Sequence, residues 1–140
     1  MSDIFVRHEQ GDRFTISVRG HHITIDQPAE DGGGDMGPTP SELFVASLAG
    51  CVGFFAERFL VRHDIPTEGL GVHGTYTYAK DAPSRVASID VQLAIPDGFP
   101  ESKIPTLMRV VDRCTVHNSL RQAPHVRIST KLLSPVGSGP

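Results

Sequence analysis

The chain has 140 residues, an apolar fraction of 39%, a charged fraction of 21% and a net charge of −3. This length predicts one domain with a substantial core, and a pI near 6.1 argues against nucleic-acid or anionic-membrane binders, which carry a basic stripe. The start of the chain lacks the features of a signal peptide, no apolar run predicts a membrane span, and two cysteines are too few for a disulfide-stapled secreted scaffold. We therefore expect a cytoplasmic protein.

The N-terminal quarter of the chain predicts a three-stranded antiparallel meander. Residues 4–9 are strand-like, and apolar side chains alternate with polar or small ones over residues 14–18 and again over 23–25. Residues 28–37 include three consecutive glycines and are expected to form a loop.

A long helix is predicted from Thr39 to about His63. Thr39 is a good N-cap, Pro40 fits the first helical position, and Glu42 completes a capping box. Apolar side chains surround the helix almost completely as far as Phe55. A helix of roughly 25 residues is about 37 Å long, which exceeds the radius of a small domain, so we expect a second subunit to cover part of it.

The second half of the chain predicts further strands and helices. Strands are expected over residues 70–78 and 89–95, helices over 101–113 and just after Cys114, and a last strand over 126–132. The order βββ-α-ββ-α-(α)-β is that of an α+β protein. We expect a single domain over residues 1–133 and a flexible tail over 134–140.

The two cysteines, Cys51 and Cys114, are the candidate chemical groups. The thiolate is the reactive form, but Cys51 lies about three turns inside its helix, beyond the reach of the terminal dipole, so an arginine would have to favour it. Two inert core cysteines are the competing interpretation. Cys114-x-x-His117 also has the spacing of metal ligands, but a structural zinc site needs four and no second close pair exists, so we expect no metal.

Two segments resemble motifs of a known family. Residues 37–51 read GPTPSELFVASLAGC, and residues 114–120 read CTVHNSL. They resemble the long-helix motif and the second-cysteine motif of the OsmC/Ohr family, which comprises osmotically inducible protein C and the organic hydroperoxide resistance proteins. The chain is most similar to a less characterised OsmC-like branch, and the resemblance extends from Phe5 to Leu132. It implies an intertwined homodimer with active sites at the subunit interface.

The resemblance also implies thiol-peroxidase activity with defined roles. Cys51 would attack the peroxide and become a sulfenic acid, Cys114 would resolve it to a disulfide, and an external dithiol of the lipoyl type would reduce that disulfide. No other cofactor is implied. Arg13, or else Arg19, and Glu42 would activate the Cys51 thiol. The apolar side chains expected to hold an organic hydroperoxide are Phe44, Phe54 and Phe55.

One departure from the family motif keeps a second function open. Ser41 follows Pro40 where the well-described hydroperoxidases have a glutamate that pairs with the activating arginine. Glu42 in the next position also has a purely structural role as a capping residue. The alternative is therefore a non-enzymatic thiol sensor or a binder of small apolar ligands on the same fold. A weaker alternative is a metal site made by Cys51, Cys114 and His117.

Overall fold

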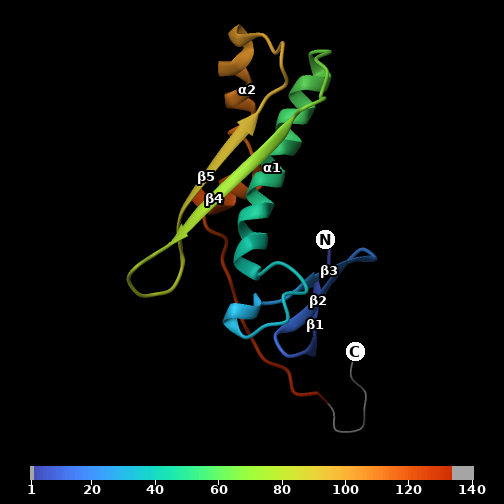
Figure 1. Cartoon of the computed structure of the whole chain (residues 1–140), viewed down its shortest axis with the longest axis vertical. Coiled ribbons are helices and arrows are strands. Elements are labelled where there is room, and N and C mark those ends of the chain that lie inside the picture. The colour runs from blue at the N-terminus through green and yellow to red at the C-terminus, as the bar shows by residue number, and fades with distance from the viewer. Residues whose placement is uncertain (1, 134–140) are drawn as a thin grey trace.

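The N-terminal segment forms the predicted antiparallel meander. In this computed structural model, which describes residues 2–133, β1 (Phe5–Gln10), β2 (Arg13–Val18) and β3 (His21–Ile25) pair in that order. Arg19 and Gly20 connect β2 to β3 with φ of +47° and +80°, as a two-residue hairpin turn of this hand requires. Figure 1 shows that this sheet lies beyond the N-terminal end of the long helix.

The long helix α1 (Pro40–Arg62) begins as the sequence predicts. The Thr39 side chain accepts the backbone N–H of Glu42 at 3.1 Å, and the Glu42 carboxylate accepts the backbone N–H of Thr39 at 2.8 Å. This reciprocal pair satisfies two of the donors that every helix start leaves free. A short 3-10 turn, η1 (Ala29–Asp31), lies in the preceding loop.

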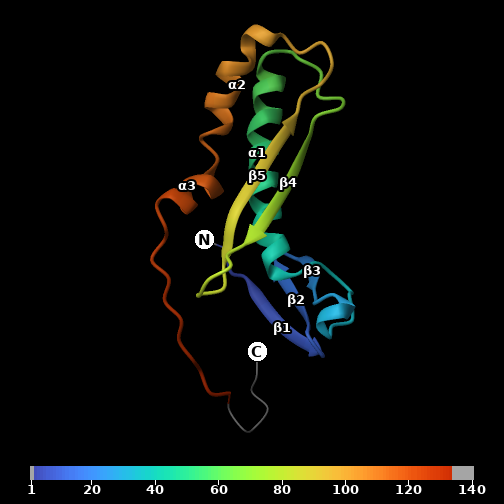
Figure 2. The ribbon, with the colours of Figure 1, turned by 60° about the vertical axis from the view of Figure 1, so that its left-hand side comes forward.

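The rest of the described chain packs along α1. β4 (Gly71–Tyr78) and β5 (Val86–Ala94) form a two-stranded antiparallel sheet against the helix. The turn η2 (Glu101–Lys103) leads into α2 (Ile104–Val111), and α3 (Thr115–Arg121) follows. Figure 2 shows α2 beside the C-terminal half of α1. The core lies between these elements and is formed by Ala56, Phe59, Leu60, Phe99, Leu107 and Val111.

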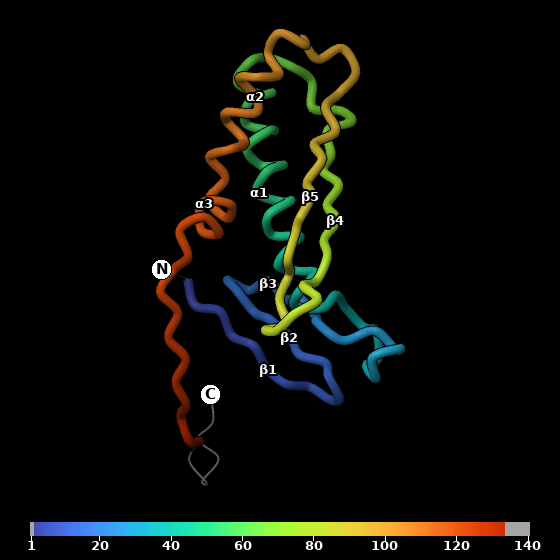
Figure 3. The backbone as a smooth tube through the Cα atoms, turned by 90° about the vertical axis from the view of Figure 1, so that its left-hand side faces the viewer, coloured from blue at the N-terminus to red at the C-terminus, as the bar shows by residue number. Residues whose placement is uncertain are grey.

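The predicted last strand is not present in the structure. Residues 123–133 form no strand within the described chain, and Ile128 and Leu132 are 89% and 97% exposed. Figure 3 shows this segment running past α3 and away from β4 and β5. The alternating pattern belongs to the segment alone, but a strand also needs a neighbouring strand to pair with, and within residues 2–133 this segment pairs with none. The predicted flexible tail, residues 134–140, lies outside the described residues.

One face of α1 is apolar but uncovered. The helix is long and apolar enough to cross a membrane, with a mean hydropathy of 1.6 over an 18-residue window, and only 28% of that window is buried. The core helix of a soluble protein passes the same test, and α1 does pack on a core through Val45, Leu48, Ala56, Phe59 and Leu60. Its outer face nevertheless leaves Phe44, Phe54 and Val61 about half exposed.

Candidate functional site

The fold brings the two cysteines together. Cys51 lies in the middle of α1, and Cys114 is the N-cap of α3, which packs against α1. Both are free thiols, and Cys51 lies close enough to Cys114 to contribute to the raised pKa of Cys114. Cys51 is half-buried, whereas Cys114 is 0% exposed. The pair therefore combines one partly exposed cysteine with one fully buried cysteine.

The environment of Cys114 favours its protonated form. Burial raises the pKa of Cys114, and the neighbouring Cys51 side chain acts in the same direction. The backbone N–H groups of His117 and Val116 lower the pKa but do not outweigh these effects. Cys114 thus stays a thiol unless a base removes its proton or the environment changes.

An apolar cavity lies beside the cysteine pair. It has a volume of about 500 Å³ and is lined by Leu48 and Val52, which flank Cys51 on α1, and by Val111 and His117, three residues on either side of Cys114. The strand β5 supplies another wall through Ile89, Val91 and Leu93. A volume of this size is typical of small-molecule sites.

A second cavity continues the first. Its volume is about 380 Å³, and it shares Leu48, Ile89 and His117 with the larger one. Phe44 lines this second cavity. The other two predicted substrate residues lie elsewhere on α1: Phe54 is 50% exposed with the Arg58 guanidinium 4.8 Å from its ring centre, and Phe55 packs against the core.

The predicted activating residues lie at the N-terminal end of α1. The Glu42 carboxylate is held by the capping box, and Cys51 lies nine residues further on, about 13 Å along the axis. The Arg13 Nε atom is 3.2 Å from a Glu9 carboxylate oxygen. Arg19 occupies the exposed turn between β2 and β3. Within residues 2–133, the polar contacts described above for Glu42 and Arg13 are with Thr39 and Glu9.

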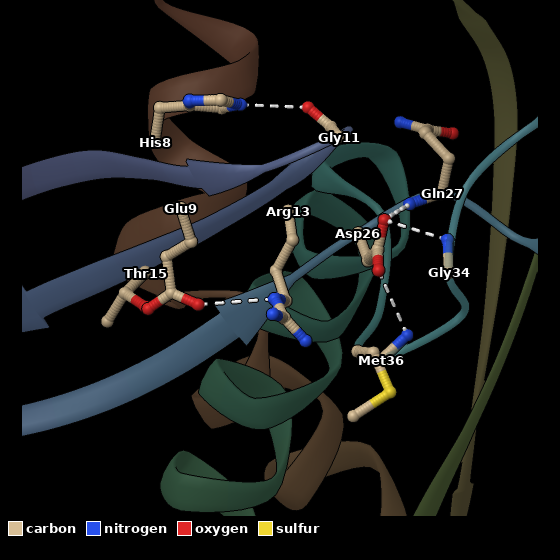
Figure 4. Close-up of polar contacts among 9 residues, drawn as sticks. All are labelled: His8, Glu9, Gly11, Arg13, Thr15, Asp26, Gln27, Gly34 and Met36. Carbon is tan, nitrogen blue, oxygen red and sulfur yellow. Dashed lines mark hydrogen bonds and ion pairs between the residues drawn. The ribbon is translucent and has the colours of Figure 1, made fainter.

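Sequence reasoning missed the buried carboxylate beside Arg13. Asp26 is 3% exposed and accepts the backbone N–H groups of Gln27, Gly34 and Met36 at 2.8, 3.4 and 3.2 Å. Burial raises the pKa of Asp26, but the three backbone donors and the charge of Arg13 outweigh burial, so the pKa of Asp26 is lowered overall. Figure 4 shows Arg13 between Glu9 and Asp26. An aspartate between a strand and a glycine-rich loop was the available signal.

A second missed group lies on the cavity. Arg121 Nη2 donates to Asp112 Oδ1 at 2.5 Å. This hydrogen bond, the Arg121 charge and a smaller effect of His117 lower the pKa of Asp112. Asp112 lines the larger cavity and Arg121 lines the second one.

Among residues 2–133, no group of three or more histidine, cysteine, aspartate or glutamate side chains is placed to hold a metal ion.

Comparison with solved structures identifies the fold. An osmotic stress induced and detoxification response protein of Psychrobacter arcticus 273-4 is 20% identical, with a TM-score of 0.77, over 85% of this chain and 88% of that chain. An OsmC like protein of Mycoplasma pneumoniae is 20% identical, with a TM-score of 0.74, over 88% and 89%. The organic hydroperoxide resistance protein OhrB of Bacillus subtilis is 19% identical, with a TM-score of 0.64, over 88% and 92%. These identities establish the shared α+β fold alone.

Comparison of sequences identifies the family. No curated protein matches the chain. The family model described as "OsmC-like protein" matches residues 32–129, which is more than half of the chain and includes both cysteine motifs. The resemblance noted in the sequence is thereby confirmed, and the chain belongs to the OsmC-like protein family.

Proposed function

We propose that the protein is a cysteine-based peroxidase that reduces organic hydroperoxides through a Cys51–Cys114 disulfide cycle. The single observation that carries this proposal is the contact between a half-buried and a fully buried thiol. Similar folds include proteins whose names state organic hydroperoxide resistance. The apolar cavity beside the pair suits an organic substrate better than hydrogen peroxide.

The accessible sulfur takes the first step. Cys51, as a thiolate, attacks the terminal peroxide oxygen; an S–O bond forms, the O–O bond breaks, and the alcohol leaves after gaining one proton. The sulfur loses two electrons and the peroxide gains them. Cys51 fits this role because a peroxide can reach a half-buried sulfur more readily than Cys114, which is 0% exposed.

The buried sulfur takes the second step. The Cys114 sulfur displaces hydroxide from the Cys51 sulfenic acid, so an S–S bond forms, an S–O bond breaks, and water is released with the thiol proton. An external dithiol, of the lipoyl class in our proposal, then reduces the disulfide by exchange. This cycle needs no bound cofactor, and we place it in the cytoplasm, where such disulfides are transient.

A second copy of the chain completes the proposed enzyme. α1 leaves Phe44, Phe54 and Val61 exposed, and residues 126–132 carry an unpaired strand pattern. A homodimer that covers these surfaces would have its site at the interface. In this proposed homodimer the partner subunit would also bring its own arginines to the interface.

The test is oxidation of the reduced protein. We expect cumene hydroperoxide to oxidise it faster than hydrogen peroxide in stopped-flow experiments, and mass spectrometry to show a loss of two hydrogens. Cys51→Ser should abolish turnover with a dithiol, and Cys114→Ser should stop at a sulfenic acid that a dimedone-type reagent traps. Full turnover by Cys51→Ser would refute the assignment.

A binding function is the second candidate. It is favoured by the placement of the activators, since Glu42 serves the capping box and Arg13 pairs with Glu9. In that case the cavity would hold a small apolar ligand, and the thiols would act at most as a sensor. Slow oxidation with both thiols intact, together with an apolar compound that co-purifies with the protein, would support binding over catalysis.

A further inference from the structure

His117 occupies a central position in the cavity system. It is the side chain common to both cavities together with Leu48 and Ile89, which are apolar. It lies half-buried in the first turn of α3, three residues after Cys114. A substrate in this space therefore meets His117 on walls that are otherwise mostly apolar.

Charged neighbours hold this end of the cavity in place. Asp112 lines the larger cavity and is close enough to His117 for the imidazole charge to lower the Asp112 pKa. Arg121 fixes Asp112 through Nη2 and also donates from Nη1 to the Asp112 carbonyl at 3.4 Å. The Asp112 carboxylate and His117 therefore lie near each other on the wall of the larger cavity.

The chemistry of the first step leaves one role unfilled. Cleavage of the O–O bond produces an alkoxide, which is a strong base and leaves readily only when a proton reaches it. Glu42 is held in the capping box at the start of α1, and Arg13 is paired with Glu9 on the N-terminal sheet. Among the residues that line the two cavities, His117 is the side chain that can both give and take a proton near neutral pH.

We propose that His117 is the catalytic acid that protonates the leaving alkoxide, with Asp112 as its positioning residue. This inference rests on the proposed peroxidase function and assigns a further residue to it. The substrate class follows from the same role: peroxides with basic leaving groups, such as alkyl hydroperoxides, need His117, whereas peroxyacids, which release a weakly basic carboxylate, do not.

The proton balance closes with one histidine. The Cys51 thiolate attacks, the O–O bond breaks, and imidazolium gives its proton to the alkoxide, which yields an alcohol, a sulfenic acid and a neutral imidazole. The neutral imidazole then accepts the Cys114 proton as the disulfide forms and passes it to the departing hydroxide. When the external dithiol regenerates the thiols, the imidazole takes one proton back and Cys51 is again a thiolate.

The test compares two peroxides with one variant. His117→Gln keeps a polar side chain but cannot donate a proton as an acid. We expect its oxidation by cumene hydroperoxide to be slower than wild type by roughly 10²-fold or more, with oxidation by peracetic acid within a few-fold of wild type. His73→Gln, on the exposed face of β4, is the matched control and should behave as wild type with both peroxides.

Each outcome decides the inference. An equal loss with both peroxides, or no loss with either, would refute the role of His117. If wild type reacts with neither peroxide, the proposed function itself fails. Asp112→Asn should reduce the cumene hydroperoxide rate by a smaller factor and leave the peracetic acid rate unchanged. The wild-type protein can be tested without mutation. We expect a solvent deuterium isotope effect on its rate of oxidation by cumene hydroperoxide and none on its rate of oxidation by peracetic acid.

Discussion

The two thiols of this protein differ because of where their backbones lie, not because of their own chemistry. Cys51 is on the surface of a long helix, whereas Cys114 is enclosed where α2 ends and α3 begins. The sequence places Cys51 on a helix and Cys114 between two helices but gives no indication of which is accessible, since exposure depends on the packing of α3 against α1. The contact between them was likewise outside the reach of sequence spacing.

The raised pKa of Cys114 makes stability depend on pH. A group whose pKa is higher in the folded state than in the unfolded chain stabilises the fold below the unfolded pKa, about 8.5 for a thiol, and this contribution is lost as pH rises through the folded pKa. We expect the free energy of unfolding of the reduced protein to fall above about pH 8.5. Denaturant titrations from pH 7 upward check this.

The control for this pH dependence is Cys114→Ala under the same reducing conditions. It removes the buried thiol and should give a flatter stability profile in the alkaline range. A wild-type profile no steeper than that of the variant would show that Cys114 does not titrate differently on folding.

The start of α1 shows how local signals define an element. Thr39, Pro40 and Glu42 predicted the cap, and the structure confirms it, because a capping box depends on four consecutive residues. The alternating pattern of β5 likewise predicted a strand correctly. Asp26 was missed because its three hydrogen bonds come from a loop whose path the sequence does not reveal.

The capping box makes a measurable contribution to stability. Thr39→Ala removes the hydroxyl that accepts the Glu42 N–H, and we expect a loss of about 1 kcal/mol in the free energy of unfolding. Ser84→Ala, in the exposed turn between β4 and β5, should change it by less than about 0.5 kcal/mol. Equal effects in denaturant titrations would show that the cap is unimportant.

The loop before α1 passes so close to β3 that position 37 requires a glycine. A Cβ atom on Gly37 would lie 2.2 Å from the Thr24 carbonyl oxygen, which is a backbone atom and cannot rotate away. We expect Gly37→Ala to cost roughly 1–3 kcal/mol. Gly71→Ala, where no atom lies within 4 Å, is the control and should be neutral or slightly stabilising; thermal unfolding of both variants gives the comparison.

The whole molecule is where sequence reasoning was least complete. Pattern alone predicted a strand over residues 126–132, yet in the described chain this segment pairs with no strand. The same reasoning predicted that α1 is too long and too apolar for one small domain, and its uncovered face agrees with that expectation. Both features agree with the homodimer that we propose, and the sequence of one chain does not reveal how two copies would pack.

The proposed dimer can be tested on the outer face of α1. Gly50 is exposed, and no atom lies within 4 Å of the position of an added Cβ. We expect wild type to have twice the 15.1 kDa chain mass in light scattering, and Gly50→Glu to shift it toward the monomer because a buried unpaired charge is costly. Ser84→Glu is the matched control. A wild-type mass of 15.1 kDa at all concentrations would refute the dimer.

The contact between Cys51 and Cys114 also couples redox state to rigidity. A bond between these sulfurs would cross-link the middle of α1 to the start of α3 and close a loop of roughly 60 residues, and chain entropy alone makes such a cross-link worth about 4 kcal/mol. Oxidation by a peroxide would therefore stabilise the fold, and reduction by a dithiol would remove that stabilisation. The melting temperature of the protein would then report whether the two cysteines are oxidised or reduced.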